Sequence, residues 1–184
     1  MPGPAFDPNG SVRFDLKRGA ASDARGARLV LVPSAAVEAL EQSHPAAAAQ
    51  LGTDLGRACG ARVAARLGGD SGVRNATLEV VISHLAGELA VAGIGSIEIE
   101  RWGRAMLLVV KNASTSGDAF LGAVLAGAVS AATSRDVATA LVEKNAGALR
   151  FFVGSRATAD RVRGMAAKGT KLGDLMGSIQ GGAA

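Results

Sequence analysis

The side chains best suited to acid–base, nucleophilic or metal chemistry are two histidines, His44 and His84, and a single cysteine, Cys59. His44 stands at a predicted helix start, where its side chain is expected to face solvent. His84 lies beside the apolar positions of its own helix, which favours a surface or interface role over catalysis. Neither histidine has a second histidine or a thiolate nearby, so a zinc ion would lack ligands. The sequence therefore predicts no catalytic residue, no metal site and no cofactor.

Other motifs of chemical interest have plainer interpretations. Residues 92–95 end a helix instead of opening one after a strand, so their two glycines indicate a C-cap and not a phosphate-binding loop. Cys59 falls on an apolar stripe, which is typical of a small buried hydrophobic residue. Glu98 and Glu100 share one strand face and have no acid–base partner in the sequence. No Gly-x-Ser-x-Gly motif presents a nucleophilic serine.

Composition favours a single domain of 184 residues with an aliphatic core, because 48% of the residues are apolar but only 3% are aromatic. The net charge of +4 comes from interspersed charges, and no aromatic side chains lie among the C-terminal basic residues, so we expect no nucleic-acid partner. The N-terminus has no signal-peptide pattern. The longest apolar helical run, 119–132, is shorter than the about 20 residues that a membrane span needs. We expect a cytoplasmic protein with no transmembrane segment.

The order of hydrophobic patterns predicts an α+β fold, with helices packed on an antiparallel sheet made of hairpins. Strands are expected at residues 12–16, 28–32, 97–102, 105–111, 137–143 and 149–153, with a polar turn at 20–26. Helices are expected at residues 34–42, 45–68, 75–93, 118–132 and 158–180. The predicted organisation is a flexible tail (1–10), one domain (11–157) and a C-terminal helix or docking tail (158–184). Its four glycines make that last helix a poor autonomous one, so it should dock on its own domain or on a protein partner.

The helix at 45–68 carries a stripe of small residues beside its apolar stripe. Interior glycines cost a helix about 1 kcal/mol each relative to alanine, so the stripe should serve a close approach of another backbone. Tight packing within the domain and a dimer interface both explain the pattern, and we predict a homodimer interface. Its residues are Gly52, Gly56, Gly60 and Ala64.

Three stretches carry a resemblance to a known family: residues 51–60, residues 92–95 leading into a strand, and residues 120–127 followed by Glu143 and by residues 149–153. Together they resemble the 4-vinyl-reductase-type domain, whose fold is shared with the TRAPP vesicle-tethering subunits and, more distantly, with haem-based nitric-oxide sensors. The resemblance covers about residues 28–155. It implies a small TRAPP-like domain that dimerises through helices and holds an apolar ligand between helices and sheet. Cysteines common in that family are absent here from 117–120 and 144–149, so a thiolate metal or redox site is not expected.

Following this resemblance, we predict a non-enzymatic, dimeric ligand-binding or scaffolding module. The alternative is an enzyme or accessory subunit in tetrapyrrole reduction. Six large apolar residues are expected to converge between the helices and the sheet as a ligand pocket. They are Val81, Leu85, Trp102, Phe120, Val124 and Phe151. Two alternatives stay open: these residues simply fill a solid core, or Trp102, at a hairpin turn, anchors a protein partner.

Overall fold

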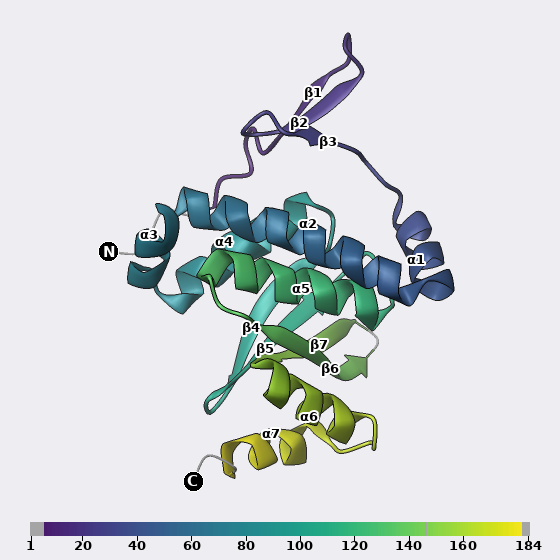
Figure 1. Cartoon of the computed structure of the whole chain (residues 1–184), viewed down its shortest axis with the longest axis vertical. Coiled ribbons are helices and arrows are strands. Elements are labelled where there is room, and N and C mark those ends of the chain that lie inside the picture. The colour runs from purple at the N-terminus through teal and green to yellow at the C-terminus, as the bar shows by residue number, and fades with distance from the viewer. Residues whose placement is uncertain (1–5, 146, 182–184) are drawn as a thin grey trace.

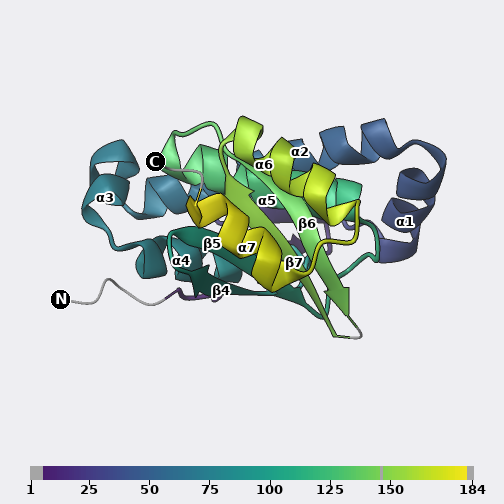
Figure 2. The same ribbon diagram turned by 90° about the horizontal axis from the view of Figure 1, so that it is seen from below.

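A four-stranded antiparallel sheet forms the centre of the protein, with helices on both of its faces (Figures 1 and 2). The computed structural model describes residues 6–145 and 147–181. Two hairpins supply the sheet, whose order is β4-β5-β7-β6. Its strands are β4 (Ser96–Trp102), β5 (Ala105–Lys111), β6 (Ala138–Asn145) and β7 (Ala148–Gly154). The predicted α+β class is confirmed.

The helices form layers around this sheet. Helices α4 (Leu78–Val91) and α5 (Asp118–Thr133) cover one face, and α2 (Pro45–Arg66) packs on them as an outer layer (Figure 1). Two short helices, α1 (Ser34–Ser43) and α3 (Gly69–Asn75), flank α2. The opposite face is covered by α6 (Arg156–Ala166) and α7 (Leu172–Gly181) (Figure 2). None of the helices in the described part of the chain is both long and apolar enough to cross a bilayer.

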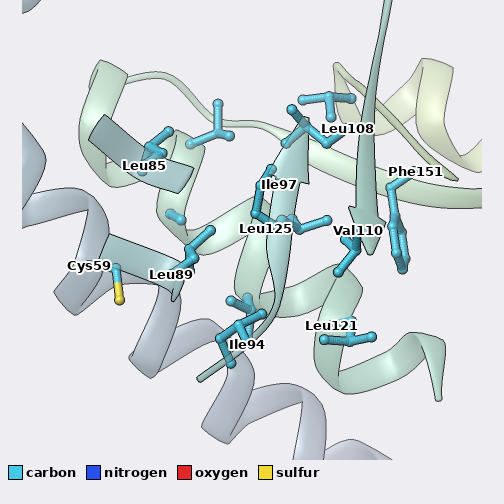
Figure 3. Packing of buried hydrophobic residues seen from close by; sticks show 14 of the residues in the cluster. Cys59, Leu85, Leu89, Ile94, Ile97, Leu108, Val110, Leu121, Leu125 and Phe151 are labelled. Atoms are coloured by element: carbon cyan, nitrogen blue, oxygen red, sulfur yellow. The ribbon is translucent and has the colours of Figure 1, made fainter. Parts of the chain in front are cut away.

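Alternation along the strands divides the apolar side chains between two cores. Leu108, Val110 and Phe151 belong to the larger core beneath α4 and α5 (Figure 3). Leu107 and Phe152, one residue away in sequence, belong to a second core together with side chains from α6 and α7. These helical side chains include Val162, Leu175 and Met176, which are at most 1% exposed. The segment predicted as a docking helix is thus packed on the chain's own sheet.

The C-terminal segment is two helices and not the single predicted one. The chain turns at Gly169, whose φ is +77°, a conformation that glycine adopts without strain. The helix predicted at 75–93 begins at Leu78. Its N-cap is Thr77, whose hydroxyl accepts a hydrogen bond from Val80 N, while Asn75, the expected cap, ends the unpredicted α3.

The N-terminal segment forms a separate three-stranded antiparallel sheet that projects from the body (Figure 1). Its strands are β1 (Val12–Asp15), β2 (Ala20–Asp23) and β3 (Arg28–Leu29). Strand β2 lies in the predicted turn, and β3 is shorter than the predicted strand 28–32. In the register of β2 and β3, residues 30–32 would lie opposite residues 20, 19 and 18, where the chain is turning from β1 into β2, so the pairing stops at Leu29. At the other end of β2, the Asp23 carboxylate accepts hydrogen bonds from Arg25 N and Ala27 N and shapes the turn into β3.

The predicted tail, 1–10, lies in part outside the described residues. Within the described part, Phe6 packs on the body: its ring lies 4.7 Å from the Arg66 guanidinium carbon and meets the His84 ring edge-on. A Cβ added at Gly87 would overlap the Phe6 ring, so this glycine leaves room for the ring on α4.

Helix α5 is capped by a side chain from another helix. Glu41 of α1 accepts a hydrogen bond from Phe120 N at 2.8 Å, in the first turn of α5. A carboxylate at a helix N-terminus satisfies a free N–H group and interacts favourably with the helix dipole. Glu41→Ala is therefore expected to lower the free energy of unfolding by about 1 kcal/mol. Urea denaturation followed by circular dichroism measures this loss.

The matched control for Glu41 is Glu38→Ala on the same helix. Among the described residues, the Glu38 carboxylate makes no hydrogen bond or ion pair. Equal losses for the two variants would show that Glu41 does not act as the cap of α5.

Candidate functional site

The glycine stripe of α2 faces α5 of the same chain. A Cβ at Gly52 would lie 2.5 Å from Phe120 O, and one at Gly56 or Gly60 would overlap the carbonyl oxygen of Val124 or Ala128. The contact is reciprocal, because a Cβ at Gly127 of α5 would lie 2.6 Å from Thr53 O. The two helices therefore meet backbone to backbone.

The predicted dimer interface at Gly52, Gly56 and Gly60 is thus wrong, since all three are buried against α5. Ala64, the fourth predicted residue, is half-buried and packs on the same core. A second copy cannot reach these backbone atoms while α5 is in place. The observed contact is packing within the domain, which was the alternative explanation of the stripe. The homodimer itself stays a prediction.

Five of the six predicted pocket residues lie in the larger core and are at most 3% exposed: Val81, Leu85, Phe120, Val124 and Phe151. The sixth, Trp102, ends β4 at the hairpin turn and is 38% exposed. Phe151 lines one groove, and Val81 lines a different one. The five core residues pack as the solid-core alternative describes.

A groove of about 540 Å³ lies along the edge of the sheet formed by β6. Helix α5 lies on one side of edge strand β6 and α6 on the other (Figure 1). The floor from α5 consists of small residues, and Arg57 of α2 and Arg163 of α6 stand at the sides. Among the lining residues are Ala119, Gly122, Ala123, Ala126, Ser130, Val137, Thr139, Leu141 and Phe151.

Most polar groups of this edge groove are already bonded within the protein. Ser130 Oγ accepts a hydrogen bond from Val137 N at 3.0 Å, and Thr139 Oγ1 donates to Gly122 O at 2.8 Å. Arg163 donates to Thr139 O, also at 2.8 Å. Arg57 makes no hydrogen bond or ion pair through its side chain to any residue within 6–145 and 147–181. The groove therefore combines a row of small side chains with charged groups: Arg57, Asp118 and the exposed ion pair Arg156–Asp136.

A second site holds most of the buried charge. Glu88 of α4 is 2% exposed and binds two arginines of α2: its carboxylate lies 2.6 Å from Arg62 Nε and 2.7 Å from Arg66 Nη2. Asp23 of β2, 4% exposed, lies 4.0 Å from Arg62 and so ties the N-terminal sheet to α2. The cluster joins α2, α4 and β2.

Cys59 adjoins this cluster, with Sγ 3.2 Å from Arg62 Nη2. Burial raises the pKa of the Cys59 thiol, so the thiol is neutral near pH 7 and a poor nucleophile. This agrees with the prediction of a small buried hydrophobic residue. Among the described residues, no three His, Cys, Asp or Glu side chains are grouped so that they could hold a metal ion.

Sequence reasoning missed both the edge groove and the Glu88 cluster. Arg62 and Arg66, four residues apart on one helix face, were a usable signal for a buried partner, but nothing in the sequence pointed to Glu88 as that partner. The groove had a weaker signal: Ala119, Ala123 and Ala126 form a row of small residues along α5, but such a row does not show whether it packs closely on a neighbour or lines an open groove.

The fold is an α+β domain with a helix-covered antiparallel sheet and an open groove at one sheet edge. No protein-family model matches the chain, and comparison with the curated proteins gives no match. Among solved structures, the chain is similar to the phenol-responsive sensory domain of the transcription activator PoxR, in a crystal structure with phenol. The TM-score is 0.55 and the identity 13%, over 78% of this chain and 84% of that chain. At an identity this low, the structural similarity shows a shared fold and nothing more specific.

Proposed function

We propose that this protein is a non-enzymatic ligand-binding module whose site is the edge groove between α5 and β6. The observation that carries the proposal is the groove itself: about 540 Å³, lined by small side chains and by the edge of Phe151. Small-molecule sites are typically concave, mostly apolar and roughly 300–1,000 Å³ in volume. A row of alanines and glycines keeps the groove open where larger side chains would fill it.

The ligand class follows from the polar groups of the groove. The hydroxyls of Thr53, Ser130 and Thr139 are bonded to backbone atoms of the same chain, so they add little polar recognition. Two charged groups of the groove, the Arg57 guanidinium and the Asp118 carboxylate, have no partner among the described residues. A small molecule with an apolar part and a hydroxyl group matches this surface, because a hydroxyl can accept a hydrogen bond from Arg57 or donate one to Asp118.

The similarity in fold to a phenol-responsive sensory domain supports a role in sensing small molecules. The resemblance of the sequence to the 4-vinyl-reductase-type domain points in the same direction, as part of this proposal. On this basis a bound ligand would act by changing how the module contacts a protein partner.

Two measurements test the proposal. Native mass spectrometry of freshly purified protein is expected to show a co-purifying small apolar mass, or an empty chain that then binds phenol in calorimetry. Ala126→Leu fills the groove and is expected to weaken binding of phenol at least about tenfold, since removing the space for a ring removes its apolar contacts.

The matched control is Ala157→Leu, the same substitution at an exposed position of α6 outside the groove. It should leave binding unchanged. Equal binding by Ala126→Leu and the parent would place the ligand elsewhere and reject the groove. A light-absorbing cofactor in the native spectrum would instead support the tetrapyrrole-reduction alternative.

A further inference from the structure

The projecting N-terminal sheet exposes an apolar strand at its edge. Strand β1 pairs with β2 on one side, and no strand of the described chain pairs with its other side. Phe14 in β1 is 60% exposed and Leu16, directly after it, is 89% exposed. An exposed edge with apolar side chains is a template for pairing with another strand, and β1 has neither a proline nor a bulge to prevent it.

The sequence of this edge is complementary to itself. Residues 12–16 read Val, Arg, Phe, Asp, Leu, which is apolar, positive, aromatic, negative, apolar. In an antiparallel pair, residues that are directly opposite each other point to the same face. We propose that two copies of this chain pair β1 with β1 in antiparallel orientation, with a two-fold axis at Phe14.

In this register each residue from 12 to 16 lies opposite a chemically compatible residue of the second copy. Phe14 meets Phe14 of the second copy, and Val12 meets Leu16 on the same face. On the other face, Arg13 meets Asp15 of the second copy, and the symmetry repeats that ion pair. Such an interface uses the same patch on both copies, as two-fold dimers do.

The ion-pairing groups are available for this contact. Arg13 and Asp15 are both exposed and form no salt bridge to any residue in the described ranges. One carboxylate oxygen of Asp15 accepts a hydrogen bond from Arg18 N, which holds its side chain at the strand end. A shift of one residue would place Arg13 opposite Phe14 instead, so charge selects the proposed register.

The position of the sheet also favours a second copy. Asp23 lies near Arg62 of α2, so the base of the sheet is attached to the body while its tip extends beyond it (Figure 1). Three further exposed apolar residues follow β3: Val30, Leu31 and Val32, which are 81%, 72% and 58% exposed. They follow β3, which β2 separates from β1, so they lie outside the proposed contact.

A charge exchange tests this contact by sedimentation of the full chain. The parent is expected to be a dimer. Arg13→Asp and Asp15→Arg each place two like-charged pairs in the interface, so each should raise the dimer dissociation constant at least about tenfold. An equimolar mixture of the two variants restores both opposite-charge pairs and should form a heterodimer. Lys17→Asp, in the adjacent turn and outside the register, is the control and should remain a dimer.

A cysteine at the axis gives a second measurement. Directly opposite strand residues have Cα atoms about 4.5–5.5 Å apart, within the range for a disulfide. Phe14→Cys should therefore form a cross-linked dimer under mild oxidation, whereas Lys17→Cys should not; the native Cys59 is buried. A monomeric parent, a dimer unaffected by Arg13→Asp, a mixture that stays monomeric, or no cross-link at position 14 would each overturn the proposal. The edge groove contains no residue of β1, so a failure of this dimer would leave the ligand-binding proposal to its own test.

Discussion

Replacing Gly56 with alanine is expected to lower the free energy of unfolding by about 3 kcal/mol, because it forces apart the two most closely packed helices of the protein. The new Cβ would overlap Val124 O and lie 2.9 Å from Ala128 N. Both obstacles are backbone atoms of α5, which cannot rotate away as a side chain can. The substitution therefore destabilises the whole contact between α2 and α5.

The matched control is Gly164→Ala in α6. A Cβ at Gly164 meets no atom within 4 Å, so only helix propensity changes and stability should rise by up to about 1 kcal/mol. Urea denaturation of the two variants should thus shift the midpoint in opposite directions. If Gly56→Ala proved as stable as the parent, the close packing of α2 on α5 would be refuted.

Glu88→Ala is the other substitution with a large expected effect. It removes the carboxylate that binds Arg62 and Arg66 and leaves two guanidinium groups near the protein interior without their partner. Breaking a buried ion pair by removing one side costs about 3–5 kcal/mol; here both arginines keep some exposure, so we expect a loss of about 3 kcal/mol. Thermal and urea unfolding of the purified variant measure it.

The control for Glu88 lies on the same helix. Glu79 also binds an arginine, Arg101, but its side chain is 61% exposed. Exposed ion pairs contribute little to stability, so Glu79→Ala should lose much less stability than Glu88→Ala, although its carboxylate also lies in the first turn of α4. Similar losses from the two variants would mean that burial does not govern the Glu88 contact.

The central hairpins and the main helices could be predicted from the sequence because their signals are local. Alternation in β4, the apolar run of β5 and the turn residues between β6 and β7 each specify structure within a few residues. The N-terminal sheet was harder. Strand β2 has the sequence Ala-Ala-Ser-Asp, which carries no apolar alternation, and it forms because it pairs with β1 across a short turn.

The glycine stripe of α2 shows what a sequence pattern cannot specify. Gly52, Gly56 and Gly60 indicate that a backbone comes close, but not whose backbone it is. The answer lies far along the chain, in α5, and only the folded chain brings the two together. The same limit explains the break at Gly169, because helix periodicity continues through it in the sequence.

The predicted pocket and the proposed edge groove have only Phe151 in common. Large apolar side chains such as Leu85 and Phe120 suggest a pocket, yet in a packed interior they fill space. An open groove instead requires small side chains beside it, as Ala119 and Ala126 provide. Small residues are common throughout this sequence, so their placement along the sheet edge could not be distinguished beforehand.

The abundance of alanine in the edge groove offers the most direct test of the central claim, which is that ligand binds between α5 and β6. The protein is labelled with carbon-13 at alanine methyl groups and titrated with phenol in methyl NMR spectra. We predict chemical-shift changes concentrated at Ala119, Ala123, Ala126 and Ala138, with Ala157 on α6 unaffected. Saturable changes confined to other alanines, or no change at any concentration, would contradict the account.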